Sequence, residues 1–330
     1  MKTPLDVVTY GEAMTMLVAA ETGDLAKVGQ FTKRVAGADL NVAIGLSRLG
    51  FRVGWMSRVG HDSFGRYVLD VLAHEGIDAG CVTIDERYPT AFQLKSKNDD
   101  GSDPAIEYFR KGSAASHLSL DDYVADYVLG ARHLHLTGVA PAISATSREL
   151  GFHMAREMRK AGKTISFDPN LRPTLWPSRE AMAEALNALA DWVMPGVSEG
   201  KILTGFAKPE DIARFYLDQG AKGVVVKLGA QGAYFRTADN EEGTVPAIPV
   251  KNVVDTVGAG DGFAVGVVSA LLEGRDVRHA LRRGNRIGAL AIQVIGDSEG
   301  LPTRSELDAL EQAGGNGTQA SGAPAAKVAS

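Results

Sequence analysis

Short apolar runs alternate with amphipathic stripes along most of this chain, and few folds accommodate such an alternation. Phe64, Tyr67, Val68 and Val71 have the i, i+3, i+4, i+7 spacing of a helix, and Gly76 closes it. Strands that alternate with helices form a mostly parallel sheet with helices on both faces. The sequence therefore predicts a three-layer α/β fold. Strands are expected at 7–10, 133–136, 164–167, 192–194, 224–227 and 233–235, and further helices at 144–161, after 178, at 209–219 and at 264–272.

Two regions interrupt this alternation, and the end of the chain differs in composition. Residues about 12–35 and 85–112 have the pattern of short β segments with polar turns, such as the one at 98–101. Residues 313–330 are rich in Gly, Ala, Ser and Thr, and they cannot bury enough apolar surface to fold. We expect one folded domain over 1–312, with two inserted β segments, and a disordered tail over 313–330.

The composition restricts the classes of partner. Of the 330 residues, 45% are hydrophobic and 23% are charged, and the formal net charge is -5. This balance gives no general attraction to nucleic acid or to anionic lipid. Cys81 is the only cysteine, which excludes an internal disulfide and fits a reducing compartment. No apolar segment precedes Asp6 and Glu12, and the longest apolar stretch, 263–272, is about half of a membrane span. We expect a cytoplasmic protein without nucleic-acid or membrane partners.

The segment 255–263, with the sequence Asp-Thr-Val-Gly-Ala-Gly-Asp-Gly-Phe, is the strongest indication of chemistry. Because it precedes the apolar run that is expected to be a buried helix, it is predicted to form the start of that helix. The backbone N–H groups of Gly258, Ala259 and Gly260 would then be uncovered and would form an anion site. Asp261 at its rim could accept a proton from a hydroxyl that attacks a bound phosphate. The alternative for a bare Gly-x-Gly-Asp is a tight loop with Asp261 as an ordinary helix cap.

This segment and a second one upstream resemble the two signatures of the ribokinase-like (PfkB) carbohydrate kinases. The upstream match runs through 37–43, 49–50 and 58–65, and it continues at Asp168-Pro169-Asn170 and Lys227-Leu228-Gly229. The resemblance covers roughly residues 5–312. It implies the ribokinase-like fold, with the two β segments forming a lid over the sugar and often a dimer contact. It also implies transfer of phosphate from ATP with Mg²⁺, and it leaves a monovalent cation as an open question.

The resemblance assigns roles to individual residues. Asp261 would be the base that deprotonates the acceptor hydroxyl, and the helix N-terminus is expected to lower its pKa and make it a weak base. Asp255 would position the substrate or support the turn. Residues of the sugar-side turn are Gly37, Ala38 and Asn41.

Nucleotide binding is marked by several segments rather than by one. No Walker-type phosphate loop is present. Glu199 matches the acid of the family's Asn-x-x-Glu motif, which influences magnesium and phosphate, but Gly196 stands in place of the asparagine. Glu199 could therefore be only a first-turn acid of its helix, and no direct metal ligand is assigned. The expected nucleotide-side residues are Asn170, Glu199, Lys227, Gly229, Gly232 and Asn285.

The choice of sugar is predicted from four features. The segment with Tyr108 and Arg110 resembles the lid strand of 2-keto-3-deoxygluconate kinases, in which these two residues face the keto acid. Arginine suits a carboxylate because its planar fork can donate two hydrogen bonds. Arg172 is at the rim of the site, Met16 replaces an aspartate that grips ring hydroxyls in ribokinases, and Asp297 matches a substrate-side aspartate.

We therefore expect an ATP-dependent kinase that converts 2-dehydro-3-deoxy-D-gluconate to its 6-phosphate and forms a homo-oligomer through the lid. The alternative within the fold is a kinase of fructose or of a related deoxy-keto sugar acid. A non-catalytic sugar sensor is disfavoured because Asp261 and the three small residues before it are present. A dinucleotide oxidoreductase would need a glycine fingerprint after the first strand, and residues 11–16 do not supply one.

Overall fold

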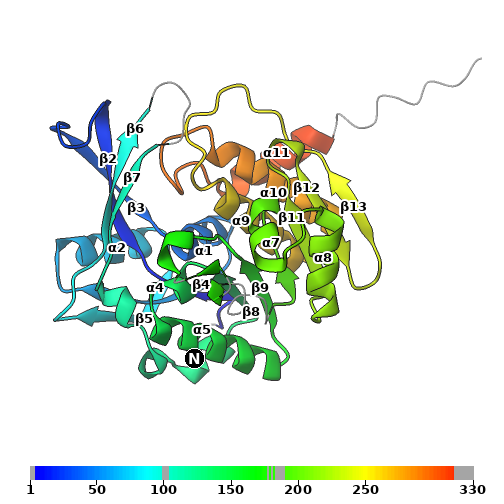
Figure 1. The fold of residues 1–330 in the computed structure, drawn as a ribbon, viewed down its shortest axis with the longest axis horizontal. Helices are drawn as coiled ribbons and strands as arrows, with labels where there is room; N and C mark the ends of the chain where they lie inside the picture. The colour runs from blue at the N-terminus through cyan, green and yellow to red at the C-terminus, as the bar shows by residue number, and fades with distance from the viewer. Residues whose placement is uncertain (1–3, 99–103, 177, 180, 183–189, 316–330) are drawn as a thin grey trace, which may run out of the picture.

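The computed structural model describes residues 4–98, 104–176, 178–179, 181–182 and 190–315. Within these residues the strands form one sheet of nine strands and a second sheet of four (Figure 1). The order in the large sheet is β13-β12-β11-β10-β9-β8-β1-β4-β5, and it is parallel except for the pairs β11–β12 and β12–β13. Its strands are β1 Val7–Tyr10, β4 Val53–Gly60, β5 Asp78–Asp85, β8 His133–Thr137, β9 Thr164–Asp168, β10 Trp192–Val193, β11 Gly223–Lys227, β12 Ala233–Thr237 and β13 Glu242–Val245.

Helices cover both faces of this sheet because its strands are apolar on both sides. Neighbouring side chains of one strand point to opposite faces, so Val7 is packed in one hydrophobic core and Val8 in the other. One core is shared with α1 Ala38–Arg48, α2 Ser63–His74, α9 Ala259–Leu272 and α10 Val277–Ala291. The other is shared with α3 Ala125–Leu129, α4 Ala140–Ile143, α5 Ala145–Lys160, α7 Val197–Thr204 and α8 Pro209–Asp218.

The order in which the chain adds strands to the sheet changes sides between the neighbouring strands β1 and β8. From β1 the strands continue through β4 to β5 on one side, and from β8 they continue to β13 on the other. In open α/β sheets the connections diverge at such a point and leave a crevice at the carboxyl ends of the strands. The N-terminus of α1 and the loops after β8 and β9 meet there, since Asp39 of α1 accepts hydrogen bonds from Thr137.

The four-stranded sheet, which we call the lid, stands beside the main body and has the order β3-β2-β6-β7 (Figure 1, left). Its rings pack together on one face, where Phe92 and Phe109 stack with their centroids 4.5 Å apart. The strands are β2 Met14–Thr22, β3 Phe31–Ala36, β6 Phe92–Lys97 and β7 Ile106–Phe109. They fall in the two regions where the sequence predicts inserted β segments.

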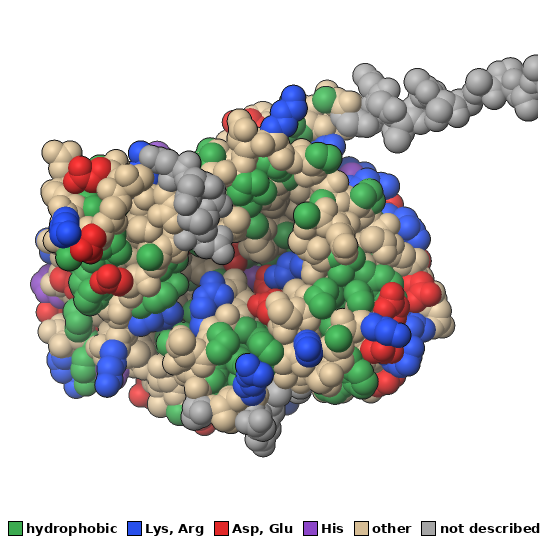
Figure 2. All heavy atoms as spheres, turned by 45° about the horizontal axis from the view of Figure 1, so that its top comes forward, with side chains coloured by type: hydrophobic (Ala, Val, Ile, Leu, Met, Phe, Trp, Pro, Cys, Tyr) green, Lys and Arg blue, Asp and Glu red, His purple; other side chains and the backbone are tan. Residues whose placement is uncertain are grey.

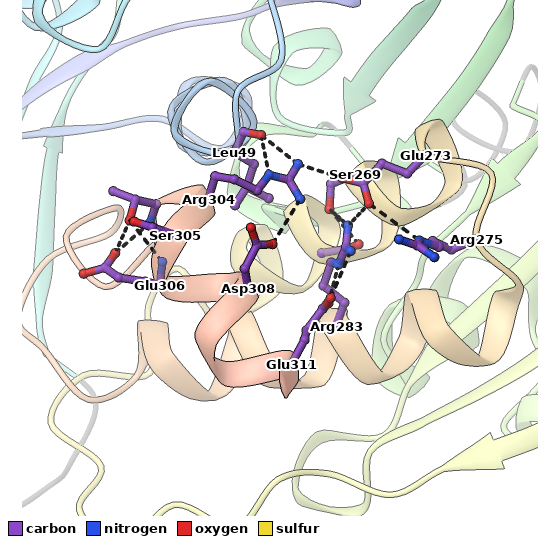
Figure 3. A network of polar contacts seen from close by, with 12 residues as sticks. Leu49, Ser269, Glu273, Arg275, Arg283, Arg304, Ser305, Glu306, Asp308 and Glu311 are labelled. Atoms are coloured by element: carbon purple, nitrogen blue, oxygen red, sulfur yellow. Dashed lines mark hydrogen bonds and ion pairs between the residues drawn. The ribbon is translucent and has the colours of Figure 1, made fainter. Parts of the chain in front are cut away.

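The last helix, α11 Arg304–Gly315, is fixed to the body by ion pairs (Figure 3). Arg304 donates to the carbonyl of Leu49 at 2.7 and 2.9 Å and to Glu273 at 2.7 Å. Glu311 of the same helix accepts from the buried Arg283 at 2.8 Å. Helix α11 continues to Gly315, three residues beyond the predicted end of the folded domain at residue 312.

The other predicted elements agree with the structure where it describes them. The six predicted strands and the helices at 64–76, 144–161, 209–219 and 264–272 are confirmed, with ends shifted by a few residues. The helix expected after Ser178 falls largely outside the described residues, as do most of the turn at 98–101 and the segment 316–330. In the part of the chain that is described, no helix is long and apolar enough to cross a membrane.

Candidate active site

A cavity of about 380 Å³ lies between the lid and the carboxyl ends of the strands. Figure 2 shows a hollow between the two parts of the molecule with acidic and basic side chains on its floor. The lid, the start of α1, the loop after β9 and the start of α9 all contribute to its wall. Predicted site residues that line it are Gly37, Ala38, Asn41, Tyr108, Arg110, Asn170, Arg172, Glu199, Lys227, Gly258, Gly260, Asp261 and Asp297.

Asp261 is held at the floor of this cavity by two asparagines from distant parts of the chain. Its Oδ2 accepts a hydrogen bond from Asn41 Nδ2 at 2.7 Å, and its Oδ1 accepts one from Asn170 Nδ2 at 2.9 Å. The side chain is in the first turn of α9 and is buried. Both amides fix the direction of the carboxylate, so its remaining lone pairs have a defined orientation in the cavity.

The expected effect of the helix N-terminus on Asp261 is wrong in direction. Burial, together with the neighbouring carboxylates of Asp168 and Asp297, raises the pKa of Asp261 to about 7. The hydrogen bond from Asn41 and the charge of Arg172 lower this pKa, but they do not compensate for the loss of water around the carboxylate. A carboxylate with a pKa close to neutral is a better general base than the weak one that the sequence suggested.

The turn before Asp261 has the geometry expected of an anion site, with one exception. Gly258 is the N-cap of α9 at φ 85°, where a Cβ would collide with the carbonyl of Asp297, so glycine is required. The N–H of Ala259 lies 3.4 Å from the carbonyl of Thr256, so it is not fully uncovered as predicted. A Cβ on Gly260 would lie 3.5 Å from the ammonium of Lys227, which adds a positive charge beside these amides.

Lys227 connects the anion site to two carboxylates. Its Nζ is 2.8 Å from both oxygens of Asp168 and 3.9 Å from Glu199 Oε2. Glu199 also accepts hydrogen bonds from the N–H groups of Leu171 at 2.8 Å and Gly196 at 2.7 Å. It is therefore a first-turn acid of α7 and, at the same time, a support for the loop that carries Asn170.

A second cavity of about 640 Å³ adjoins the first and is mostly apolar. The two cavities share Lys227, Thr256 and Gly260, so a phosphate at the start of α9 would be accessible from both. The predicted nucleotide-side residues Gly229, Gly232 and Asn285 line the second cavity. Asn285 donates to the carbonyls of Val245 and Pro246 at 3.2 and 2.9 Å, so it holds the wall of this cavity in place.

The two arginines predicted to bind a carboxylate have different surroundings. Arg110 Nη2 lies 2.7 Å from Oε2 of the buried Glu12, which also accepts a hydrogen bond from Ser113. Arg172 donates only to main-chain carbonyls, those of Asn170 at 3.4 Å and Leu171 at 3.0 Å, among the bonds that the described residues make. Arg110 is therefore paired with a buried carboxylate, whereas Arg172 makes no ion pair among the described residues. Arg172 acts on Asp261 and Asp297 at a distance, where its charge lowers their pKa.

Asp255 and Asp297 share a buried lysine that comes from the lid. Lys95 Nζ is 2.6 Å from Asp255 Oδ2 and 3.0 Å from Asp297 Oδ1. Asp255 does not line the first cavity, and its carboxylate also accepts from the N–H groups of Val257 and Gly296. The structure thus places Asp255 behind the wall as a support of the turn, and it places Asp297 in the wall itself.

Residues 4–304 match the family described as pfkB family carbohydrate kinase. The chain belongs to this family. A protein of Bacillus subtilis (strain 168) named 2-dehydro-3-deoxygluconokinase is 51% identical over 307 residues, which is 92% of this chain and 94% of that protein. The crystal structure of a PfkB protein from Polaromonas sp. JS666 has a TM-score of 0.86 at 55% identity, and covers 92% of this chain and 99% of its own. An E. coli structure with ATP and Mg²⁺ bound has a TM-score of 0.84 at 28% identity, over 94% of this chain and 99% of its own.

Glu12, Lys95 and Asp168 form ion pairs with predicted residues of this sugar kinase's site but were not themselves predicted as site residues. Asp168 belongs to the Asp-Pro-Asn segment of the family resemblance, so a signal for it existed. Lys95 follows Gln93 at the strand period of two, and Gln93 lines the cavity. This spacing places the side chains of Gln93 and Lys95 on the same face of β6, but the sequence does not show which face of the lid packs against the main body.

Proposed function

We propose that this chain transfers the γ-phosphate of ATP to the 6-hydroxyl of 2-dehydro-3-deoxy-D-gluconate. The observation that carries this proposal is the 51% identity to the Bacillus subtilis protein of that name, over nearly the whole of both chains. The cavity supports it chemically, because it presents two arginines, Arg110 and Arg172, in the same space as Asp261. Because Arg110 already pairs with Glu12, the carboxylate of the keto acid would pair chiefly with Arg172, which makes no ion pair among the described residues, and a neutral sugar would not.

In the proposed reaction Asp261 accepts the proton of the 6-hydroxyl as its oxygen attacks the γ-phosphorus. The O–H bond breaks, a bond forms between the sugar oxygen and phosphorus, and the bond from phosphorus to ADP breaks. Asn41 and Asn170 keep the carboxylate directed at the hydroxyl, at 2.7 and 2.9 Å from its two oxygens. The amides of the Gly258–Gly260 turn and the Lys227 ammonium stabilise the charge on the transferred group.

We also propose that ATP binds with its base in the apolar cavity and with Mg²⁺ on its phosphates, where the ion neutralises negative charge. No group of three or more His, Cys, Asp or Glu side chains in the described ranges could hold a metal ion. Magnesium commonly uses one or two carboxylates together with substrate phosphates and water. Of the two carboxylates around Lys227, Glu199 lines the first cavity and would hold the ion, whereas Asp168 is buried and both of its oxygens accept from Lys227.

The test is a kinase assay with ATP and a panel of acceptors: 2-dehydro-3-deoxy-D-gluconate, a related deoxy-keto acid, fructose and ribose. We expect the highest kcat/KM for 2-dehydro-3-deoxy-D-gluconate, and ³¹P NMR should show a phosphomonoester on its terminal carbon. A higher kcat/KM for fructose than for every keto acid would contradict the substrate assignment but leave the kinase chemistry intact.

Two further proposals concern the location of the enzyme and its assembly. We place the enzyme in the cytoplasm, where ATP is available and Cys81 stays reduced. We also propose a homo-oligomer that forms through the lid, because Phe109 of β7 is 46% exposed, whereas its neighbour Tyr108 lines the cavity. Analytical ultracentrifugation should show a species larger than a monomer, and Phe109→Ser should weaken it. A monomeric wild-type protein would contradict this proposal.

A further inference from the structure

A single lysine of the lid is buried against two loops of the main body. Lys95 is on β6, and its side chain is 1% exposed. Its ammonium lies 2.6 Å from Asp255 of the loop before α9 and 3.0 Å from Asp297 of the loop after α10. Lysine is almost never fully buried unless it is paired. Burial lowers the pKa of Lys95, but the two carboxylates outweigh this effect and keep the pKa above its ordinary value, so the side chain stays charged.

The two carboxylates hold the turn that carries the anion site. Asp255 accepts hydrogen bonds from the N–H groups of Val257 at 3.1 Å and Gly296 at 3.3 Å, so it ties the two loops together. Gly258 packs directly against the carbonyl of Asp297. Without a cation between them, Asp255 and Asp297 would repel each other in a region of low dielectric. Asp297 would also lose its paired cation and keep only the more distant charge of Arg172, in the cavity that receives anionic phosphates.

We propose that the Lys95 ammonium is a built-in monovalent cation of the phosphoryl-transfer site, so that this kinase needs no inorganic monovalent cation between its two loops. The space between the carboxylates is taken by the ammonium, which leaves no room for a second cation there. Lys95 is thus a positioning residue: it acts on the phosphate through the Gly258–Gly260 turn. The inference rests on the proposed phosphoryl transfer at this site, but not on the identity of the sugar.

The first test uses the wild-type protein with choline as the only monovalent cation. Adding K⁺, Na⁺ or NH₄⁺ at constant ionic strength should change kcat by no more than about twofold, because only general screening remains to be altered. A requirement for K⁺ or NH₄⁺ in the wild-type protein would overturn the proposal. The assay uses whichever sugar the substrate panel selects, so a wrong substrate assignment does not affect this outcome.

The second test is Lys95→Met, which keeps an unbranched apolar stem, removes the charge and ends one atom short, so that the position of the ammonium is left open. Breaking a buried ion pair on one side leaves the other side uncompensated, so kcat in choline should fall by about 100-fold or more. K⁺ or NH₄⁺ should restore much of it in a saturable way, and tetramethylammonium, which is too large for the gap, should not. Lys33→Met is the control, because Lys33 is an exposed lysine of the same sheet that stacks on Tyr67.

Thermal unfolding without any substrate gives an independent readout. A cation that binds only the folded state raises the Tm, so K⁺ should stabilise Lys95→Met relative to choline and leave wild type and Lys33→Met unchanged. Full activity of Lys95→Met in choline would overturn the proposal, and so would a folded but inactive variant that no cation rescues. If Lys95→Met does not fold, Lys95→Gln takes its place, because its amide can still donate a hydrogen bond to one carboxylate.

Discussion

At the scale of the residue, the chemistry of Asp261 is set by competition among burial, hydrogen bonds and neighbouring charges. Burial raises its pKa to about 7, and the carboxylate must be ionised to accept a proton. Activity should therefore be lost as the pH falls through this value, and kcat/KM should drop about tenfold for each pH unit below it. Because the hydrogen bond from Asn41 lowers this pKa, Asn41→Ala should move the acidic limb of the profile to higher pH. A limb below pH 5 in the wild-type profile would show that a different group limits the rate.

The raised pKa of Asp261 also makes the free energy of unfolding depend on pH. A carboxyl group whose pKa is raised in the folded state binds more protons in the folded protein than in the unfolded chain between about pH 4 and 7. Its contribution to the free energy of unfolding therefore falls as the pH rises through that range. Asp39, which is buried beside Thr137 and has a pKa of about 8, acts in the same direction. These groups reduce stability in the range where the base is active.

The two arginines of the cavity are predicted to behave differently. Arg172→Ala should lower kcat/KM for the keto acid by about 10- to 100-fold, the value of a charge-assisted hydrogen bond, and should affect a neutral sugar much less. Arg110→Ala should lower activity on both substrates and also lower the Tm, because it leaves Glu12 buried without its cation. The double variant Arg110→Ala, Glu12→Gln should recover the Tm. Equal losses on the acid and the neutral sugar for Arg172→Ala would mean that this arginine does not contact the carboxylate.

At the scale of the element, the turn at the start of α9 needs glycine for two different reasons. Gly258 is needed for the backbone conformation, and Gly260 leaves space for the phosphate. Gly258→Ala should lower the Tm, because its φ of 85° disfavours a side chain and the Cβ would meet the Asp297 carbonyl. Gly260→Ala should keep the Tm, since its Cβ would meet only the Lys227 ammonium at an ordinary 3.5 Å. It should still lower kcat, by up to about 100-fold, through crowding of the phosphate. A normal kcat for Gly260→Ala at saturation would argue against an anion site here.

At the scale of the whole molecule, the layers could be predicted from the sequence because each strand and helix carries its own periodic pattern. The stripe at 64–71 and the run at 224–226 specify local structure without help from the rest of the chain. The resemblance to the family assigned Asn41 to the sugar side, Asn170 to the nucleotide side and Asp261 to catalysis, and the structure brings both asparagines to Asp261, although 220 positions separate Asn41 from Asp261.

What could not be predicted depends on which distant segments meet and how deeply they are buried. Nothing in the local sequence of Lys95 shows that two aspartates more than 150 positions away receive its charge. The pKa of Asp261 was expected to fall because the helix dipole can be read from the sequence, whereas its burial cannot. The partnership of Glu12 with Arg110 likewise joins the start of the chain to the lid, and it alters the prediction made for that arginine.

The most direct test of the central claim is to measure kcat for Asp261→Asn with 2-dehydro-3-deoxy-D-gluconate, alongside its affinity for ATP. The variant keeps the shape of the side chain and loses the ability to accept a proton, and it keeps both hydrogen bonds only if Asn41 or Asn170 turns its amide oxygen toward the new NH2 group. We predict a kcat about 100- to 10,000-fold below that of the wild type, with the nucleotide affinity changed by no more than about threefold. A residual kcat within about tenfold of the wild-type value would contradict the role of Asp261 as the base.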